Sequence, residues 1–286
     1  MKITNAPKKA KHRGLVVLII IIAAAALLLL DSRYRIVTTE YELTYDRLPA
    51  GFDGFRIAAL SDLHMRDYGE RLPELVKAQA PDIIVLTGDF LNARTSETEG
   101  SQTERLRPLL AEFAKIAPCY FVSGNHEWAS GEMQQLSDML DELGIVYLRN
   151  EFVLLEKGGD SVVLAGVEDP NGPADMIKPD KLADIIAQSY PDKYTLLLAH
   201  RNDLLAKYPE LKVDTIICGH AHGGIMRLPF VGGVFGTDRS FFPKYDAGVF
   251  SEGRCDMVLS RGLGEYMKVP RFLNNPELVT VVLKKS

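Results

Sequence analysis

The chain has 286 residues, of which 47% are hydrophobic and 25% are charged. This composition is typical of a globular protein, and the length suits one large domain or two small ones, so a disordered or fibrous protein is excluded. A formal net charge of −5 and three scattered cysteines are not the signs of a nucleic-acid-binding surface or of a disulfide framework.

The chain begins with a basic tail, residues 1–13, that holds five cations and no acid. Residues 14–30 then contain no charge and are almost wholly Leu, Ile, Val and Ala. A helix of this length spans about 25 Å, at the short end of what the hydrocarbon core of a bilayer, about 30 Å thick, requires. This pattern predicts a transmembrane anchor at 14–30, followed by a single domain at 31–286.

Two other interpretations of residues 14–30 stay open. A cleaved signal sequence has a similar composition, although the small-residue run 23–26 precedes four leucines, so cleavage after it would leave an apolar new terminus. A buried core helix is the other. If residues 14–30 are an anchor, the basic tail before them favours a cytoplasmic N-terminus. We therefore expect a single-pass cell-membrane protein whose main domain is extracytoplasmic and, being acidic, repels nucleic acid.

The remainder of the chain alternates short apolar runs with amphipathic segments. A first strand is expected around residues 41–45. Runs with the length of buried strands follow at 55–60, 82–86, 119–122, 161–165, 194–199, 213–218, 257–259 and 278–283. Apolar residues have helical spacing at 70–80, 104–116, 134–143 and 181–188. This alternation predicts an α/β domain with a largely parallel sheet, and the glycines after residue 223 predict added antiparallel strands.

Polar residues with metal-binding side chains directly follow five of the expected strands. In chain order, these residues and their polar neighbours are Asp62, His64, Asp89, Asn125, His126, Glu127, His200, His220 and His222. In open α/β sheets, ligands bind at the carboxyl ends of the strands. We therefore expect these side chains to meet in one place, although Asp62 and His222 lie 160 positions apart.

The residue types indicate the chemistry of this site. Residues two apart, such as Asp62 and His64, can project to the same side of an extended turn. Imidazole, carboxylate and amide donors together suit Mn²⁺, Zn²⁺ or Fe. The seven candidate ligands are too many for one ion: Asp62, His64, Asp89, Asn125, His200, His220 and His222. We expect two divalent cations bridged by Asp89, as in sites that cleave phosphoesters.

The ordered motifs resemble those of the calcineurin-like metallophosphoesterase superfamily. The motifs are D-x-H at residues 62–64, G-D at 88–89, G-N-H-E at 124–127, a single H at 200 and G-H-x-H at 219–222. The N-terminal segment and the ending around 260–277 are also similar to the membrane-associated bacterial branch of YkuE-like and YaeI-like phosphoesterases. This resemblance implies a sandwich of two mixed β-sheets flanked by helices, here preceded by one N-terminal transmembrane helix.

The resemblance also implies a role for each site residue. Three residues would hold each metal and one would bridge: Asp62, His64 and His222 for the first, Asn125, His200 and His220 for the second, with Asp89 between them. His126 would be the catalytic residue, which reaches a phosphoryl oxygen or protonates the leaving group. Glu127 would orient a ligand or His126, and Arg201 is a weaker candidate for contact with a substrate phosphate.

The expected function is that of a membrane-anchored, metal-dependent phosphoric ester hydrolase. A hydroxide bridging the two cations would attack phosphate mono- or diesters, including lipid or cell-envelope substrates. Two alternatives stay open: a pyrophosphatase acting on a nucleotide-linked lipid precursor of the UDP-diacylglucosamine type, and a metal-binding scaffold without turnover. Two loops are also open to two interpretations. Residues 168–173 either rim the site or form a plain turn, and the aromatic residues of 230–245 either face lipid or pack in the core.

Overall fold

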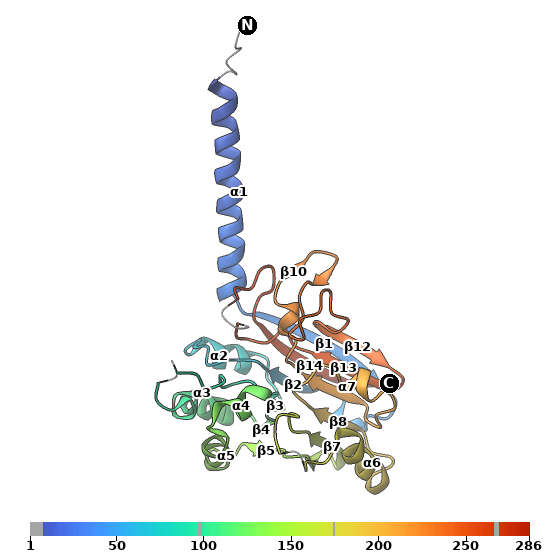
Figure 1. Ribbon diagram of the computed structural model, residues 1–286. Helices are drawn as coiled ribbons and strands as arrows, with labels where there is room; N and C mark the ends of the chain where they lie inside the picture. The colour runs from blue at the N-terminus through green and yellow to red at the C-terminus, as the bar shows by residue number, and fades with distance from the viewer. Residues whose placement is uncertain (1–7, 97–98, 174, 266–268) are drawn as a thin grey trace.

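The computed structural model describes residues 8–96, 99–173, 175–265 and 269–286. For residues 8–12 it describes the backbone alone. A long helix, α1 (Lys8–Tyr34), projects from an α/β body (Figure 1). Its segment Arg13–Tyr34 contains an apolar window with a mean hydropathy of 2.9, and no part of that window is buried against the described body. By length and composition this helix could cross a membrane, and a signal sequence would have the same features.

The first sheet has six strands, and the last strand of the chain lies inside it. Its order is β1 (Val37–Tyr45), β14 (Glu277–Lys285), β2 (Phe55–Leu60), β3 (Ile83–Leu86), β4 (Cys119–Phe121) and β5 (Val146–Tyr147). Strand β14 is antiparallel to β2, while β2, β3, β4 and β5 run parallel to one another. The sheet is therefore mixed, with a parallel half whose carboxyl ends share one edge.

The second sheet also has six strands and is mixed. Its order is β12 (Gly248–Glu252), β13 (Cys255–Leu259), β9 (Thr215–Cys218), β8 (Thr195–Leu198), β7 (Asp160–Gly166) and β6 (Glu151–Lys157). The central strands are parallel, and an antiparallel strand lies at each edge. A two-stranded hairpin, β10 (Arg227–Leu228) and β11 (Gly232–Gly233), lies apart from both sheets.

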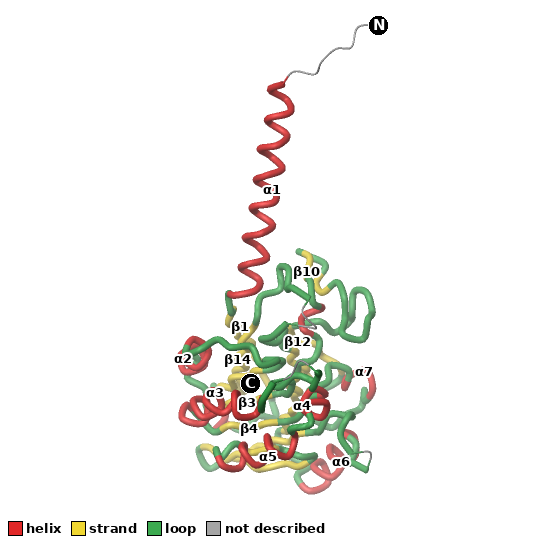
Figure 2. The backbone as a smooth tube through the Cα atoms, turned by 60° about the vertical axis from the view of Figure 1, so that its left-hand side comes forward, coloured by secondary structure: helices red, strands yellow, loops and turns green. Residues whose placement is uncertain are grey.

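Alternating side chains of the strands pack into different apolar layers. In β2, Ile57 and Ala59 contact the core between the two sheets, while Ala58 and Leu60 face the helices on the other side. Those helices are α2 (Arg71–Ala78), α3 (Gln102–Ile116) and α5 (Met133–Glu142), and α6 (Pro179–Ser189) covers the second sheet (Figures 1 and 2). Because both faces are buried, a strand such as β3 is a continuous apolar run.

The predicted α/β sandwich of two mixed sheets is confirmed, as are added antiparallel strands near the C-terminus. The sequence did not predict β6, an edge strand, or α4 (Asn125–Ser130), a helix of six residues. A second short helix, α7 (Leu204–Lys207), was also not predicted. These elements are short or lie at an edge, so they leave little apolar periodicity.

Candidate metal centre

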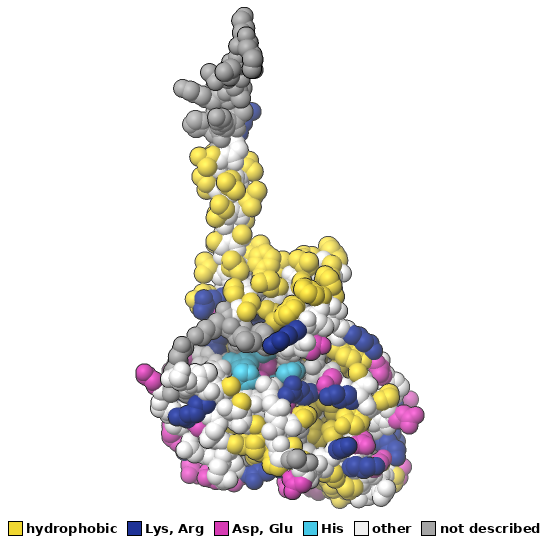
Figure 3. All heavy atoms as spheres, in the orientation of Figure 1, with side chains coloured by type: hydrophobic (Ala, Val, Ile, Leu, Met, Phe, Trp, Pro, Cys, Tyr) yellow, Lys and Arg dark blue, Asp and Glu magenta, His cyan; other side chains and the backbone are white. Residues whose placement is uncertain are grey.

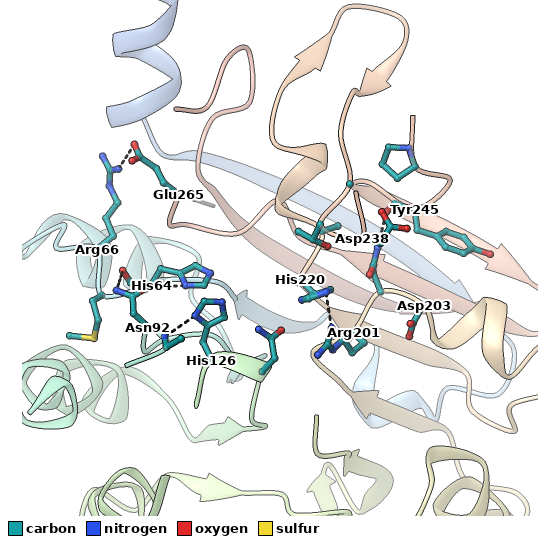
Figure 4. Close-up of a pocket in the computed structure, with 18 of the residues that line it drawn as sticks. His64, Arg66, Asn92, His126, Arg201, Asp203, His220, Asp238, Tyr245 and Glu265 are labelled. Carbon is teal, nitrogen blue, oxygen red and sulfur yellow. Dashed lines mark hydrogen bonds and ion pairs between the residues drawn. The ribbon is translucent and has the colours of Figure 1, made fainter. Parts of the chain in front are cut away.

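The loops after β2, β3, β4, β8 and β9 meet at one end of the body, as Figure 4 shows. Asn125 and His126 are the first two residues of α4, which follows β4. A cleft of about 1500 Å³ lies over this end, and His64, Asn125, His126 and His220 line it. The buried members of the set, Asp62, Asp89, His200 and His222, belong to the same side-chain clusters. In Figure 3 the histidines gather in a hollow close to the body end of α1.

One group of donor atoms consists of Asp62, His64 and His222. The His64 Nε2 and His222 Nε2 atoms are 3.1 Å apart, and His222 Nε2 is 3.4 Å from Asp62 Oδ1. One ligand atom from each of the three lies within 4.8 Å of the others. This is the group that the family resemblance assigns to one metal.

Asp89 links a second group to the first. Its Oδ2 atom is 3.2 Å from His200 Nε2 and 3.8 Å from His64 Nε2. His200 Nε2 is in turn 3.1 Å from His220 Nδ1. Asp89 therefore lies between the two histidine groups, where a carboxylate could contact two cations at once.

Asn125 supplies a further donor atom for the second group. Its Oδ1 atom is buried and accepts no hydrogen bond from any residue that the structure describes. An unsatisfied buried amide oxygen costs about 1–3 kcal/mol. A cation beside Asn125 would remove this cost, so the observation fits a metal at this position.

Hydrogen bonds orient the rings of two histidines. The His64 Nδ1 atom donates to Asn92 Oδ1 at 3.2 Å, and Asn92 Nδ2 donates back to the His64 carbonyl oxygen. His200 Nδ1 donates to the carbonyl oxygen of Thr87 at 2.8 Å. With Nδ1 as the donor, Nε2 is the nitrogen of each ring that can bind a metal, which is the usual way that partners orient metal-binding histidines.

The backbone at the site is in an unfavourable conformation. Asp62, His64, Asp89, His220 and His222 all have φ between 48° and 68°. A non-glycine residue in this left-handed region costs on the order of 1 kcal/mol or more, and such residues cluster at functional sites. Five of the seven candidate ligands thus have a conformation that only the surrounding contacts maintain.

Burial and neighbouring charges shift the pKa values of the ligands. Burial lowers the pKa of His64 to about 4 and holds the pKa of His220 and of His222 well below the ordinary value. Burial acts in the same direction on His200, but the charge of Asp89, the hydrogen bond to it and the charges of Asp62 and Asp169 together outweigh burial and raise the pKa to about 10. Three rings are therefore neutral donors, and His200 pairs with Asp89 through a proton that a cation could replace.

Glu127 positions the turn that carries Asp89. Its two carboxylate oxygens accept the backbone N–H groups of Asp89, Phe90, Leu91 and Gly124 at 2.7–3.0 Å. Burial raises its pKa to about 7, while these N–H groups oppose the rise. Gly124 packs so close to Asp89 that a Cβ there would collide with the carboxylate. The carboxylate of Asp89 is thus fixed from two sides.

His126 lies at the mouth of the cleft. Its Nδ1 atom accepts the backbone N–H of Ala93 at 2.9 Å, so in the neutral ring the proton is on Nε2. That Nε2 atom is 4.0 Å from Asp89 Oδ2. The arrangement presents a proton donor beside the donor clusters.

Arg201 enters the cleft from the other side (Figure 4). Asp169, which is buried, holds it through two contacts at 2.6 and 3.1 Å. The Nη1 atom of Arg201 is 3.0 Å from His220 Nε2 and must be the donor. A fixed guanidinium therefore borders the donor clusters, as expected for a group that contacts phosphate.

Residues 55–224, more than half of the chain, match the family model for calcineurin-like phosphoesterases. The chain belongs to this family. The prediction made from the motifs is confirmed, and the chain is a member of a family of metal-dependent phosphoric ester hydrolases.

Several bacterial relatives match most of this phosphoesterase. The metallophosphoesterase YkuE of Bacillus subtilis is 28% identical over 88% of this chain and 87% of its own length. The phosphodiesterase YaeI of Escherichia coli is 29% identical over 73% of this chain and 75% of its own length. The UDP-2,3-diacylglucosamine pyrophosphatase LpxG of Chlamydia trachomatis is 25% identical, over 80% and 83% respectively.

Two site residues were not predicted from the sequence. Asn92 orients His64 and lies only three positions after Asp89, but a lone asparagine in a loop is unremarkable. Asp169 belongs to the loop 168–173, which was expected either to rim the site or to be a plain turn. In the structure this loop lines a neighbouring cavity of about 370 Å³. Asp169 does not line the cleft itself and acts on it by holding Arg201, which does.

Proposed function

We propose that the chain is a membrane-anchored phosphoesterase that binds two divalent cations and hydrolyses phosphate mono- or diesters. The observation that carries the proposal is the position of Asp89, whose Oδ2 atom contacts both donor clusters, at 3.2 Å from His200 Nε2 and 3.8 Å from His64 Nε2. Each cluster alone would be an ordinary buried contact. Two clusters joined by one carboxylate are the arrangement that a pair of cations needs.

The residues fit such a pair. Asp62, His64 and His222 would hold one cation, while Asn125, His200 and His220 would hold the other. The mixture of donors suits Mn²⁺, Zn²⁺ or Fe. When bound, the cations would supply positive charge to the phosphoryl group and activate water for hydrolysis.

Residues of the chain itself would position the substrate. His126 presents its Nε2 proton to the cleft and would donate it to a phosphoryl oxygen or to the leaving group, a contribution of about 10²- to 10⁴-fold. Arg201 donates to Nε2 of His220, whereas Nδ1 of His220 faces His200, so a cation could bind at Nδ1 while Arg201 stays in place. The Arg201 guanidinium lines the cleft and could bind a substrate phosphate.

The helix α1 would hold this site at a membrane. The five cations in residues 1–13 favour a cytoplasmic tail, which would place the catalytic body outside the cytoplasm. Arg33 and Tyr34 at the end of α1 line the cleft. A site that opens beside the anchor favours phosphoester groups of lipids or of the cell envelope. Protease accessibility of the body in intact cells would test the orientation.

A pyrophosphatase activity on a nucleotide-linked lipid precursor is the second candidate. LpxG acts on such a compound by its name, and its similarity covers 80% of this chain. A cleft of about 1500 Å³ has room for a nucleotide and a sugar. Release of a nucleoside monophosphate from UDP-diacylglucosamine would favour this activity over simple ester hydrolysis.

The test uses the full chain purified in detergent. Metal content is measured after loading with Mn²⁺, and hydrolysis of bis-p-nitrophenyl phosphate is followed with and without a chelator. We expect two cations per chain and hydrolysis that the chelator abolishes. Two bound cations without turnover of mono- or diesters would favour a scaffold, and fewer than two would contradict the proposed centre.

A further inference from the structure

The hairpin β10–β11 and the loop after it expose an unusual set of apolar side chains. Phe230 at the tip is fully exposed, and five more large side chains near it are partly or mostly exposed. We call these six residues the apolar lip: Met226, Leu228, Phe230, Val231, Phe241 and Phe242. The aromatic residues of 230–245 thus divide, because Tyr245 is buried and Phe235 packs edge-on against Phe241.

The backbone conformation at the tip is also unfavourable for an aromatic residue, so the stability of the fold does not explain why Phe230 is there. The N–H of Val231 donates to the carbonyl oxygen of Leu228, which closes a four-residue turn with Phe230 in its third position. Phe230 has φ of 67°, a left-handed value that glycine or asparagine adopts at little cost and phenylalanine does not. An aromatic residue here stabilises neither the turn nor the core. A function outside the body accounts for it better.

The lip and α1 lie at the same end of the molecule. Figures 1 and 2 both show β10 beside the emerging helix, and Figure 3 shows a continuous area of hydrophobic side chains over the two. Exposed apolar side chains also occur elsewhere, such as Ile185 on α6, but α6 lies at the opposite end of the body in Figure 1. The lip is therefore continuous with the surface that would enter a membrane.

Neighbouring residues tie the lip and the helix to one segment. The Nδ2 atom of Asn274 donates to the carbonyl oxygens of His222 and Ile225, at the base of the lip. The Nδ2 atom of Asn275 donates to the carbonyl oxygen of Asp31 near the end of α1. Since both contacts start from adjacent residues, the position of the lip relative to the helix is fixed, and so is its connection to the loop of His222.

We propose that the apolar lip inserts into the same bilayer that α1 crosses, in the leaflet next to the catalytic body. This inference rests on the anchoring proposed above. A single helix leaves the body free to turn about the helix axis. A second contact at Phe230 would fix the body so that the cleft, which Arg33 of α1 and Asp238 of the loop after β11 both line, opens toward the lipid headgroups.

The test measures the depth of single labelled positions in the full chain. A nitroxide label is attached to F230C in nanodiscs of phosphatidylethanolamine and phosphatidylglycerol, and its collisions with oxygen and with a water-soluble nickel chelate are compared. The three native cysteines, Cys119, Cys218 and Cys255, are buried, so labelling is selective. I185C on α6 is the matched control, and L18C within α1 reports anchoring.

We expect the label at position 230 to collide more with oxygen than with the nickel chelate, as at position 18, and the label at position 185 to show the reverse. A lipid-exposed label at 18 with a water-exposed label at 230 would contradict insertion of the lip and would leave the proposal of a membrane anchor standing. A water-exposed label at 18 would overturn both. Strong coupling between labels at 230 would show a second copy on the lip and would also contradict membrane insertion. None of these readings depends on activity.

Discussion

Glu127 holds four backbone N–H groups with two oxygens, and one of those groups belongs to Asp89. Glutamine in its place offers one acceptor oxygen and an N–H₂ group that would face other donors. We expect Glu127→Gln to lower the free energy of unfolding by about 1–3 kcal/mol, as for buried donors left unpaired. Metal affinity should fall as well, because the Asp89 turn would shift.

The matched control for this variant is Glu142→Gln on α5, where the carboxylate is exposed and pairs with Arg107 at the surface. Its effect should stay within about 0.5 kcal/mol. Thermal unfolding and metal analysis compare the stability and the metal content of the two variants. Equal stability and equal metal content in both would show that Glu127 does not position the turn.

His126 and Asp89 differ in what they are expected to contribute. His126→Ala should lower turnover by about 10²- to 10⁴-fold, the range for a lost proton donor, while metal content stays unchanged. Asp89→Asn should lower the occupancy of both cations, because the bridging charge is lost. Metal analysis beside initial rates separates the two effects. Equal metal loss in both variants would overturn this division of roles.

Individual site residues were predictable when their type and position carried the information. Histidines and carboxylates placed directly after apolar runs, such as Asp62 and His200, mark strand ends that face a ligand. Asn92 and Asp169 act only through a partner, and such a relation exists in space and not in the sequence. The left-handed backbone of His64 was likewise not predictable, because nothing local favours it.

At the scale of elements, burial decided what could be predicted. Strands β3, β8 and β9 are fully buried, and they are apolar in the sequence apart from the threonine that begins β8 and β9. Strand β6 lies at an edge, and Leu155 is the one buried residue within it. The order of the strands was out of reach, since β14 pairs between β1 and β2 and nothing local in the sequence selects those two partners.

The position of β14 leads to a prediction about stability. Leu278 of β14 is fully buried, whereas Leu154 on the edge strand β6 is partly exposed. Leu278→Ala should cost about 2–5 kcal/mol and lower the melting temperature by at least about 4 °C. Leu154→Ala is the same substitution and should lower it less. Thermal unfolding followed by circular dichroism would compare the two variants, and equal shifts in melting temperature would argue against an interior position of β14.

At the scale of the whole molecule, metal binding should stabilise the fold. The unfavourable backbone of five candidate ligands and the unsatisfied Asn125 oxygen are costs that the metal-free protein bears. A ligand present at 100 times its dissociation constant stabilises the native state by about 2.7 kcal/mol, which corresponds to a rise of roughly 5–10 °C in melting temperature. Mn²⁺ should produce such a rise, and a chelator should reverse it.

The matched control for this measurement is Asp89→Asn, in which the rise should be much smaller. An unchanged melting temperature of the wild-type chain across a titration with Mn²⁺, Zn²⁺ and Fe²⁺ would show that the site does not bind these ions. The acidic body, the apolar helix and the lip would then need an explanation other than a phosphoesterase held at a membrane.

The central claim is that Asp89 joins two cations in one centre. Anomalous diffraction from crystals soaked in Mn²⁺ tests it most directly. We predict two peaks separated by about 3.5–4 Å, with the Asp89 carboxylate between them, one peak beside His64 and His222 and the other beside Asn125 and His200. A single peak, or two peaks that do not share Asp89, would contradict the account.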